Sequence, residues 1–447
     1  MRFPANVSPG PFSRRHTSRS ALTVIEILIA ATLSLVMILS MVQIFETAGG
    51  AIQKARASLA LSARMRLAAM RLNIDLDNVT APLRPRLNPR DGLGYFEYIE
   101  GPSRDNDSDA NNDPDTTQDL DSSGTPDIDE GLLDGSAGDI DDVIMFTIKS
   151  IGEPFVGRVE TTINGGGVIE SNLAEIVWFT EYDDDNGNGA WDFGEEINIY
   201  RRVLLIRPDL DASLSTAGTL TTFFQRNDLS VSNFTGSYVA NSLSDLTKRE
   251  NRFAHANTFP HELDRTTLAS YILTGTNTGQ DVMVSNVLAF DVRAYDPEAP
   301  VVSDGNVALI PGDPEYASYP SPASEIGRGA FVDLQYAPAL SPASFFSAVP
   351  NNVSNATNNT TMAVPAYCTW STHYESNGDN EDGDAFIDEL INGLDDDSID
   401  GVDDPNEHET FPPYSASLRG IQITMRTVEI DTKQVRQSSV VSNFVPE

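Results

Sequence analysis

The hydrophobic pattern of this chain begins with an apolar run over residues 22–44, in which Glu26 is the one charged side chain. At a rise of 1.5 Å per residue, a helix over this run is roughly 34 Å long and can cross a bilayer whose hydrocarbon core is ~30 Å thick. A carboxylate inside such a helix costs at least ~2.5 kcal/mol and normally marks a function with a partner group. The pattern therefore predicts a transmembrane helix whose acidic residue has a role.

Beyond residue 49, apolar side chains recur every three or four positions, which is the spacing of one helix face. This predicted face consists of Ile52, Ala55, Leu59, Ala63, Leu67, Met70 and Ile74. Three prolines between residues 82 and 89 are expected to end the helix. We therefore predict one helix over residues 22–79, roughly 87 Å long, with one half in lipid and the other against a domain. Two separate helices, broken at Gly49 and Gly50, are the alternative.

After residue 89 the pattern changes to that of β-strands, with alternating apolar residues or with branched and aromatic side chains. The predicted strands include residues 144–148, 175–182, 197–206, 287–295 and 421–425. Residues 297–365 are rich in Pro, Ser, Ala and Asn and are predicted to form a long loop. A long helix followed by many strands indicates an α+β fold, in which residues 80–447 form a β-rich domain with an antiparallel sheet packed on the helix.

Charge narrows the possible partners, because the chain has 66 acidic and 29 basic residues and a net charge of −37. Phosphate binding needs Lys and Arg, so nucleic acid is excluded as a natural partner. The single cysteine, Cys368, allows no intrachain disulfide bond and is expected to be a buried structural thiol. Stability must therefore come from packing or from bound metal.

The first part of the chain, residues 1–21, carries four arginines and no acidic residue, which suits a cytoplasmic leader. The segment after the apolar run is also basic, so charge alone leaves the orientation open. A secretory signal peptide would have a shorter apolar core and a cleavage site after it. A generic signal anchor is the other alternative, although it gives no reason to keep Glu26.

The basic leader, the apolar helix and the glutamate near its start closely resemble the type IV prepilin signal. In that family a specialised peptidase cuts after a small residue, and glutamate is the fifth residue of the mature chain. Here the matching cleavage site lies between Ala21 and Leu22, which makes Glu26 the fifth residue, and alanine replaces the usual glycine before the cut. The resemblance implies N-methylation of Leu22 and pairing of Glu26 with the Leu22 amine of a neighbouring subunit.

The closing segments, residues 418–430 and 440–445, and also residues 200–208, resemble J-type minor pseudopilins of type II secretion. This resemblance implies a subunit that a prepilin peptidase processes, that one inner-membrane helix anchors, and whose C-terminal domain is periplasmic. With other pseudopilins or pilins, it would assemble on the inner-membrane secretion platform into a pseudopilus for type II protein secretion, in contact with membrane lipid. The alternatives are a minor type IV pilin and a pilin-anchored surface adhesin that depends on calcium.

Acidic residues concentrate in three inserts, residues 100–142, 181–196 and 375–409, which hold 15, 7 and 15 of the 66 acids. Two inserts have the spacing of an EF-hand calcium loop, with a glycine for its sharp turn and a final glutamate. The first loop offers Asp119, Asp121, Ser123, Asp127 and Glu130, with the backbone carbonyl of Thr125. The second loop offers Asp184, Asn186, Asn188, Asp192 and Glu195, with the backbone carbonyl of Ala190. Convincing helices flank neither loop, so we expect calcium loops in a β context.

The third insert is a decayed tandem of Asp/Gly loops, with candidate calcium ligands Asp382, Asp384 and Asp388. A solvated acidic loop is the alternative interpretation. The sequence contains no nucleotide-binding loop, Gly-x-Ser-x-Gly elbow or zinc-protease histidine pair. We therefore predict a calcium-binding structural subunit that is not an enzyme.

Overall fold

The computed structural model divides the chain into two compact units, Met1–Ala57 and Ser58–Glu447. It describes residues 23–101, 140–160, 163, 165–182, 196–214, 219–234, 236–313, 316–319, 323–336, 345–347, 353, 365–381, 383, 387, 401–402, 408–430 and 432–444. The second unit begins at Ser58, so it includes the last part of the long helix as well as the strands.

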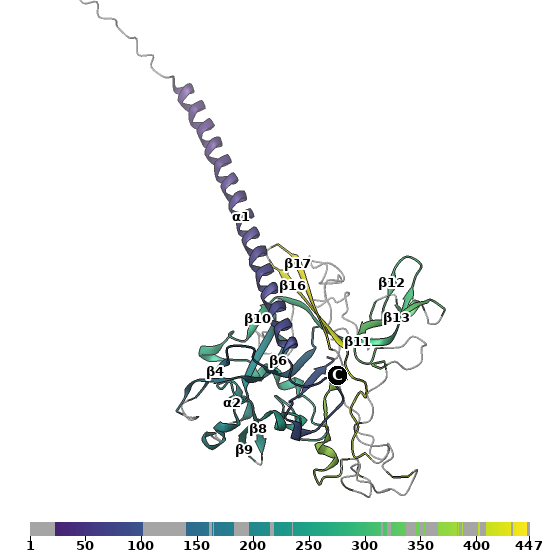
Figure 1. The fold of residues 1–447 in the computed structure, drawn as a ribbon. Helices are drawn as coiled ribbons and strands as arrows, with labels where there is room; N and C mark the ends of the chain where they lie inside the picture. Colours follow the sequence, from purple (N-terminus) through teal and green to yellow (C-terminus); the bar gives the residue numbers. More distant parts are fainter. Residues whose placement is uncertain are drawn as a thin grey trace, which may run out of the picture. The chain divides into compact units, whose positions relative to one another are not determined.

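The N-terminal helix, α1, runs without a break over 54 residues, Val24–Asp77 (Figure 1). The predicted long helix is confirmed, and the alternative of two helices broken at Gly49 and Gly50 is wrong. Each glycine costs about 1 kcal/mol relative to alanine, which is too little to interrupt a helix with long helical stretches on both sides. Residues 24–49 are exposed throughout, and the helix is long and apolar enough to span a membrane.

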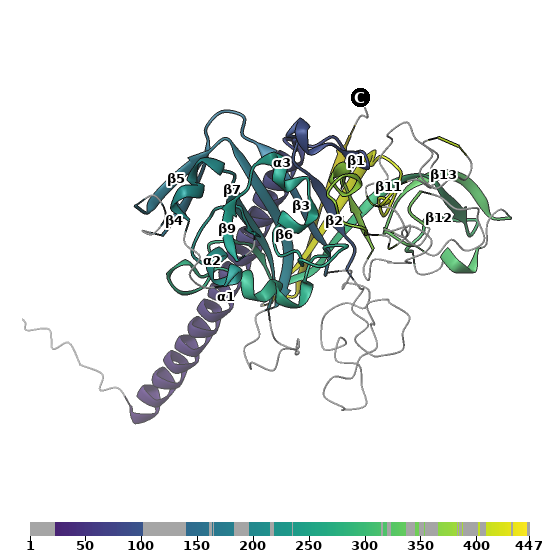
Figure 2. The same cartoon turned by 90° about the horizontal axis from the view of Figure 1, so that it is seen from below.

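The first sheet of the second unit has six strands in the order β10-β7-β6-β3-β2-β14, and every neighbouring pair is antiparallel. Its strands are β2 (Phe96–Ile99), β3 (Val143–Lys149), β6 (Leu173–Tyr182), β7 (Ile197–Leu205), β10 (Val282–Ser285) and β14 (Ala366–Cys368). Figure 2 shows β7, β6, β3 and β2 following one another across this sheet. The strands predicted at residues 144–148, 175–182 and 197–206 are confirmed.

The second sheet has the order β12-β11-β16-β17, and β13 also pairs with β11. Its strands are β11 (Val287–Ser303), β12 (Ala308–Leu309), β13 (Glu325–Val332), β16 (Gly420–Glu429) and β17 (Gln434–Asn443). The long loop predicted over residues 297–365 is therefore wrong in part, because β11 continues through Pro297 and Pro300. The register between β11 and β13 shifts between Asp296 and Pro300, and such an irregularity lets a strand accommodate proline.

Smaller elements lie around the two sheets. Short strands pair as β1 (Arg86–Leu87) with β15 (Trp370–Ser371), β4 (Phe155–Val159) with β5 (Gly167–Ser171), and β8 (Val231–Phe234) with β9 (Ser237–Ala240). The short helices are α2 (Leu220–Phe224), α3 (Leu243–Leu246), η1 (Pro89–Asp91), η3 (Pro208–Ser213), η4 (Arg249–Asn251), η5 (Arg265–Tyr271), η6 (Gly275–Asn277), η7 (Tyr316–Ser318) and η8 (Thr372–Glu375).

The last part of α1 packs into the core of the second unit. Its buried apolar residues are Leu61, Met65, Ala68, Leu72 and Leu76. The helix was predicted to pack on the sheet, but the predicted face was wrong, since Leu59, Leu67 and Met70 are 71%, 63% and 62% exposed. This part of α1 is apolar on two sides, and periodicity alone does not tell which side the domain covers.

Candidate functional site

The start of α1 holds Glu26 in a reciprocal contact with Thr23. The backbone N–H and the hydroxyl of Thr23 donate to Glu26 Oε2 at 2.9 and 3.0 Å, and Glu26 N–H donates to Thr23 Oγ1 at 3.3 Å. This is a capping box, which satisfies backbone donors that a helix start leaves unpaired. This role of Glu26 was not predicted, although Thr-x-x-Glu before an apolar run is the sequence signature of a capping box. The cleavage residues, Ala21 and Leu22, lie outside the described residues.

Asp75 fixes the end of α1 to the six-stranded sheet. Its buried carboxylate accepts hydrogen bonds from Arg201 Nε at 2.7 Å and Nη2 at 2.9 Å, and from Trp178 Nε1 at 3.1 Å. Arg71, one turn earlier on the helix, lies 3.4 Å from the same carboxylate. The role of Asp75 was not predicted, because in the sequence an acidic residue beside an apolar helix face looks like an ordinary solvated residue.

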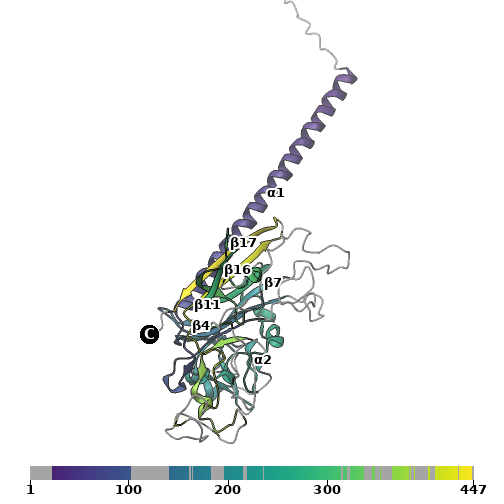
Figure 3. The same cartoon turned by 90° about the vertical axis from the view of Figure 1, so that its right-hand side faces the viewer.

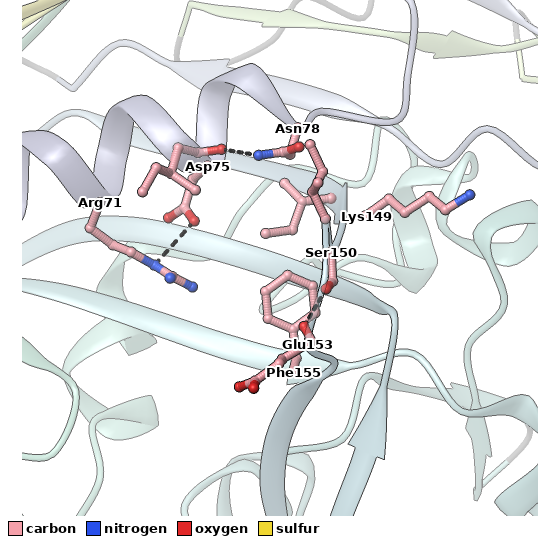
Figure 4. A pocket seen from close by; sticks show the side chains of 10 residues that line it. Arg71, Asp75, Asn78, Lys149, Ser150, Glu153 and Phe155 are labelled. Carbon is pink, nitrogen blue, oxygen red and sulfur yellow. Dashed lines mark hydrogen bonds and ion pairs between the residues drawn. The ribbon is translucent and has the colours of Figure 1, made fainter.

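A pocket of about 140 Å³ lies beside this ion pair, between the end of α1 and the turn after β3 (Figure 4). Arg71 turns toward Asp75, whereas Lys149 points away from them. Asn78 Nδ2 donates to the Ile74 carbonyl at 2.6 Å, and the Ser150 hydroxyl donates to the Glu153 carbonyl. Because most polar groups around the pocket bind one another, we interpret it as part of the helix anchor.

The first two acidic inserts leave the six-stranded sheet at the same end. The first joins β2 to β3, where Ile99 pairs with Val143, and the second joins β6 to β7, where Tyr182 pairs with Ile197. Since β2, β3, β6 and β7 are antiparallel neighbours, both connections lie at one end of the sheet. The expected β context of both loops is confirmed, whereas their predicted calcium ligands lie outside the described residues.

Carboxylates at the base of the first insert accept hydrogen bonds from backbone N–H groups of the domain. Asp142 is fully buried, and its two oxygens accept the N–H groups of Gly101 at 3.0 Å and of Val292 in β11 at 2.6 Å. Glu100 Oε2 accepts the Leu334 N–H at 2.7 Å. The base of the second insert touches that of the first, because the Thr180 hydroxyl donates to the Ile140 carbonyl. The two inserts therefore start from one connected region.

The described ends of the third insert also contain buried carboxylates. Glu375 accepts the N–H groups of Glu409 and Thr410 and lies 3.3 Å from Arg86 Nη1. Glu381 Oε2 is buried and has no hydrogen-bond partner in the described part of the chain. Burial, with a smaller contribution from the charge of Glu409, raises the pKa of Glu381 to about 7.

The metal ligands predicted in the third insert, Asp382, Asp384 and Asp388, lie outside the described residues. Within the residues that are described, the structure brings together no group of three or more His, Cys, Asp or Glu side chains that could hold a metal. Calcium binding by this insert stays a prediction.

A buried ionic cluster joins β2 to the segment that follows α3. Glu97 Oε1 lies 2.6 Å from Arg249 Nη2, and Glu97 Oε2 lies 2.7 Å from Arg252 Nη1 and 3.1 Å from His255 Nε2. Burial alone would raise the pKa of Glu97, but the charges of Arg249, His255 and Arg252 hold it well below its usual range. The sequence contained one indication of this cluster, because Glu97 is the one acidic residue in the otherwise uncharged strand β2.

Cys368 lies in β14 beside this cluster and is 1% exposed. Burial raises the pKa of its thiol to about 11, so the reactive thiolate is scarce at neutral pH. The predicted burial of this thiol is confirmed.

No family model, curated protein or solved structure matches this chain. Its function is therefore inferred from its own residues and from the geometry described above.

Proposed function

We propose that the chain is a pilin-like subunit, specifically a minor pseudopilin of type II secretion. A prepilin peptidase would cut between Ala21 and Leu22, and α1 would anchor the subunit in the inner membrane with its C-terminal domain in the periplasm. The subunit would then enter a pseudopilus on the secretion platform. The proposal includes no enzymatic activity.

One observation carries the proposal: α1 presents apolar surface along both of its parts. In the first unit every side chain from Val24 to Phe45 is exposed, and all but Glu26 are uncharged. In the second unit, Leu59, Leu67 and Met70 remain exposed although the domain covers other residues of the same helix. Lipid can cover the first surface, whereas the second surface favours packing against another stalk helix.

Glu26 has two successive roles in this proposal. In the isolated subunit its carboxylate accepts the N–H and hydroxyl of Thr23, which lowers the cost of placing a charge near lipid. On assembly, the free amine of Leu22 in a neighbouring subunit would pair with Glu26 and cancel two charges that lipid penalises.

The deciding experiment is coexpression of the full chain with a prepilin peptidase, followed by mass spectrometry of the N-terminus. We expect loss of residues 1–21 and an N-methylated Leu22. An intact leader, or a cut after residue 44, would contradict the pilin assignment. A minor type IV pilin would give the same spectrum, so co-purification with secretion or pilus subunits separates these two functions.

We further propose that the acidic inserts bind calcium. The spacing of the first two loops and their common origin at one sheet end support this proposal. Glu381, inside the third insert, supports it too, because its buried Oε2 has no hydrogen-bond partner among the described residues. A calcium-dependent adhesin is the second candidate function, because two such loops at one end would form a single acidic surface. A ligand screen of the full chain with calcium and with a chelator tests it.

A further inference from the structure

β17 is the outer strand of the five-stranded sheet (Figure 3). All ten of its residues pair with β16, from Asn443 opposite Gly420 to Gln434 opposite Glu429, without a register shift. Within the described residues, no strand pairs with its other side. One long edge of the sheet is therefore unpaired among the residues that the structure describes.

The ladder geometry identifies the open backbone groups. Phe444 N–H donates to the Arg419 carbonyl at 2.8 Å, and the register of the two strands places these residues opposite each other, so they mark a hydrogen-bonded position of the ladder. Because such pairs alternate along an antiparallel ladder, the even-numbered residues of β17 face β16. The odd-numbered residues direct their N–H and C=O groups outward, and no described residue bonds to these groups. They are Val435, Gln437, Ser439, Val441 and Asn443.

This edge has few of the features that normally protect an exposed strand. Natural edges are short, bulged or interrupted by proline or charge. β17 is ten residues long and contains no proline, and Arg436 is its one charged residue. Four of the five outward-directed residues are exposed, including Val441 at 44%. An extended peptide can therefore reach the edge and add a strand to it.

Charge indicates the chemistry of that peptide. Although the whole chain has a net charge of −37, residues 418–444 hold four basic and two acidic residues. Arg419 and Arg436 are exposed. Arg436 Nη2 donates to the neutral oxygens Ser58 Oγ at 3.1 Å and Gln434 Oε1 at 3.2 Å, and neither arginine has an acidic partner in the described part of the chain. A second copy of β17 would bring the same cations together, which is unfavourable. An acidic strand would instead match them.

We propose that β17 binds an extended, acidic segment of a partner protein by strand addition. Main-chain hydrogen bonds to the odd-numbered residues provide the affinity, and Arg419 and Arg436 select carboxylate side chains. This proposal does not depend on calcium binding or on the pseudopilin assignment, because it rests on the edge of one sheet.

The test uses the full chain in detergent micelles and fluorescence anisotropy with labelled synthetic peptides. The probe is a peptide of about ten residues that alternates valine and glutamate, long enough to cover the strand. One control peptide has lysine in place of glutamate, and another has N-methyl groups on alternate backbone nitrogens. We expect both control peptides to bind at least about tenfold more weakly than the acidic peptide. Added salt should weaken the binding of the acidic peptide.

Two variants of the protein locate the binding site. Ser439→Pro blocks the outward edge without removing a bond to β16, and it should abolish binding. Ser439→Ala is its matched control, since it loses the same hydroxyl contact with Thr424 but keeps the backbone N–H, and it should bind normally. Arg436→Glu should weaken binding of the acidic peptide and strengthen binding of the lysine peptide. This variant tests the edge even if the proline variant fails to fold.

Failure of the acidic peptide to bind would overturn the proposal. Equal binding to wild type and to folded Ser439→Pro, or equal affinity for the N-methylated peptide, would also overturn it. Self-association of the full chain that Ser439→Pro removes would assign the edge to a second copy instead of an acidic partner.

Discussion

Glu26 and Glu97 are acidic residues in apolar stretches of sequence, yet their surroundings differ. The Glu97 side chain is fully buried and meets Arg249, Arg252 and His255. Glu26 is exposed and bonds to Thr23, one turn away. Glu97 balances two buried guanidinium groups, so its removal is costly to the fold, whereas the exposed Glu26 carboxylate is the one that we propose to pair with another subunit.

Removing the charge of Glu97 should strongly destabilise the second unit. Glu97→Gln keeps the shape of the side chain but leaves two buried guanidinium groups without a counter-charge, so we expect a loss of about 3–5 kcal/mol in unfolding free energy. Urea unfolding of the full chain in detergent measures this loss. Glu153→Gln, at an exposed turn, is the control and should change stability by less than about 0.5 kcal/mol.

The effect of Glu97 should also depend on pH. Because the pKa of Glu97 is lowered in the folded protein, its stabilising contribution is present above the unfolded value of about 4.3 and is lost as pH falls through the lower folded value. The stability difference between wild type and Glu97→Gln should therefore be constant near neutral pH and shrink below about pH 4. A difference that stays constant into acid would contradict this assignment.

The two roles proposed for Glu26 can be separated by substitution. Glu26→Gln keeps an oxygen for the capping box but removes the charge, and Glu26→Leu removes both. We expect both variants to insert into the membrane and to be absent from purified filaments. Thr23→Val, which removes the hydroxyl of the box, should still assemble. Normal assembly and secretion by Glu26→Leu would show that charge pairing has no role.

Among the elements, α1 has two apolar faces that differ in burial, because the domain covers one of them and leaves the other exposed. Leu72 is fully buried in the core of the second unit, whereas Leu67, five positions earlier, is 63% exposed. Asp75 adds an ion pair to the buried face through Arg201. The domain therefore covers one face and leaves the other exposed, which is the face that we propose to contact another subunit.

The two leucines provide a matched test of this division. Leu72→Ala should cost about 2–5 kcal/mol of unfolding free energy, because it removes buried methyl groups and leaves a cavity. Leu67→Ala should change stability by less than about 0.5 kcal/mol, since its side chain is largely exposed. Urea unfolding followed by tryptophan fluorescence distinguishes them. Equal losses would mean that both faces are buried within the subunit.

At the scale of the whole molecule, charge is distributed very unevenly. Three inserts hold 37 of the 66 acidic residues, and two of these inserts leave the same end of one sheet. Crowded carboxylates repel one another, and like charges about 4 Å apart cost on the order of 1 kcal/mol or more even near water. A divalent cation that binds several carboxylates at once would convert this repulsion into stabilisation.

Calcium should therefore raise the melting temperature of the full chain. A ligand that binds only the folded state contributes about 2.7 kcal/mol at a hundred times its dissociation constant. We expect millimolar calcium to raise the midpoint, chelator to reverse the change, and magnesium to reproduce it poorly, since magnesium needs stricter octahedral geometry. Scanning calorimetry in detergent provides the measurement.

Loop variants assign that calcium effect to individual loops. Asp184→Ala with Glu195→Ala should remove more of the rise than Asp119→Ala with Glu130→Ala, because the second insert is the shorter connection between paired strands. An unchanged melting curve across calcium, magnesium and chelator would show that the inserts are solvated acidic loops.

Features that depend on neighbouring residues could be predicted from the amino-acid sequence. Hydrophobic periodicity and the prolines after residue 80 were sufficient to predict α1 and its end, and alternation was sufficient for strands such as β3 and β6. The α+β class followed from the order of these elements. The cleavage site and the calcium loops are also local patterns, but their residues lie outside the described part, and they stay predictions.

Features that depend on residues far apart in the sequence became visible in the folded protein. Glu97 meets Arg249 across 152 positions, and no local pattern connects them. The covered face of α1, the common origin of two acidic inserts and the open edge of β17 depend on which strands pair and in what order. Periodicity reports how apolar a face is, but contacts between distant segments decide what covers that face.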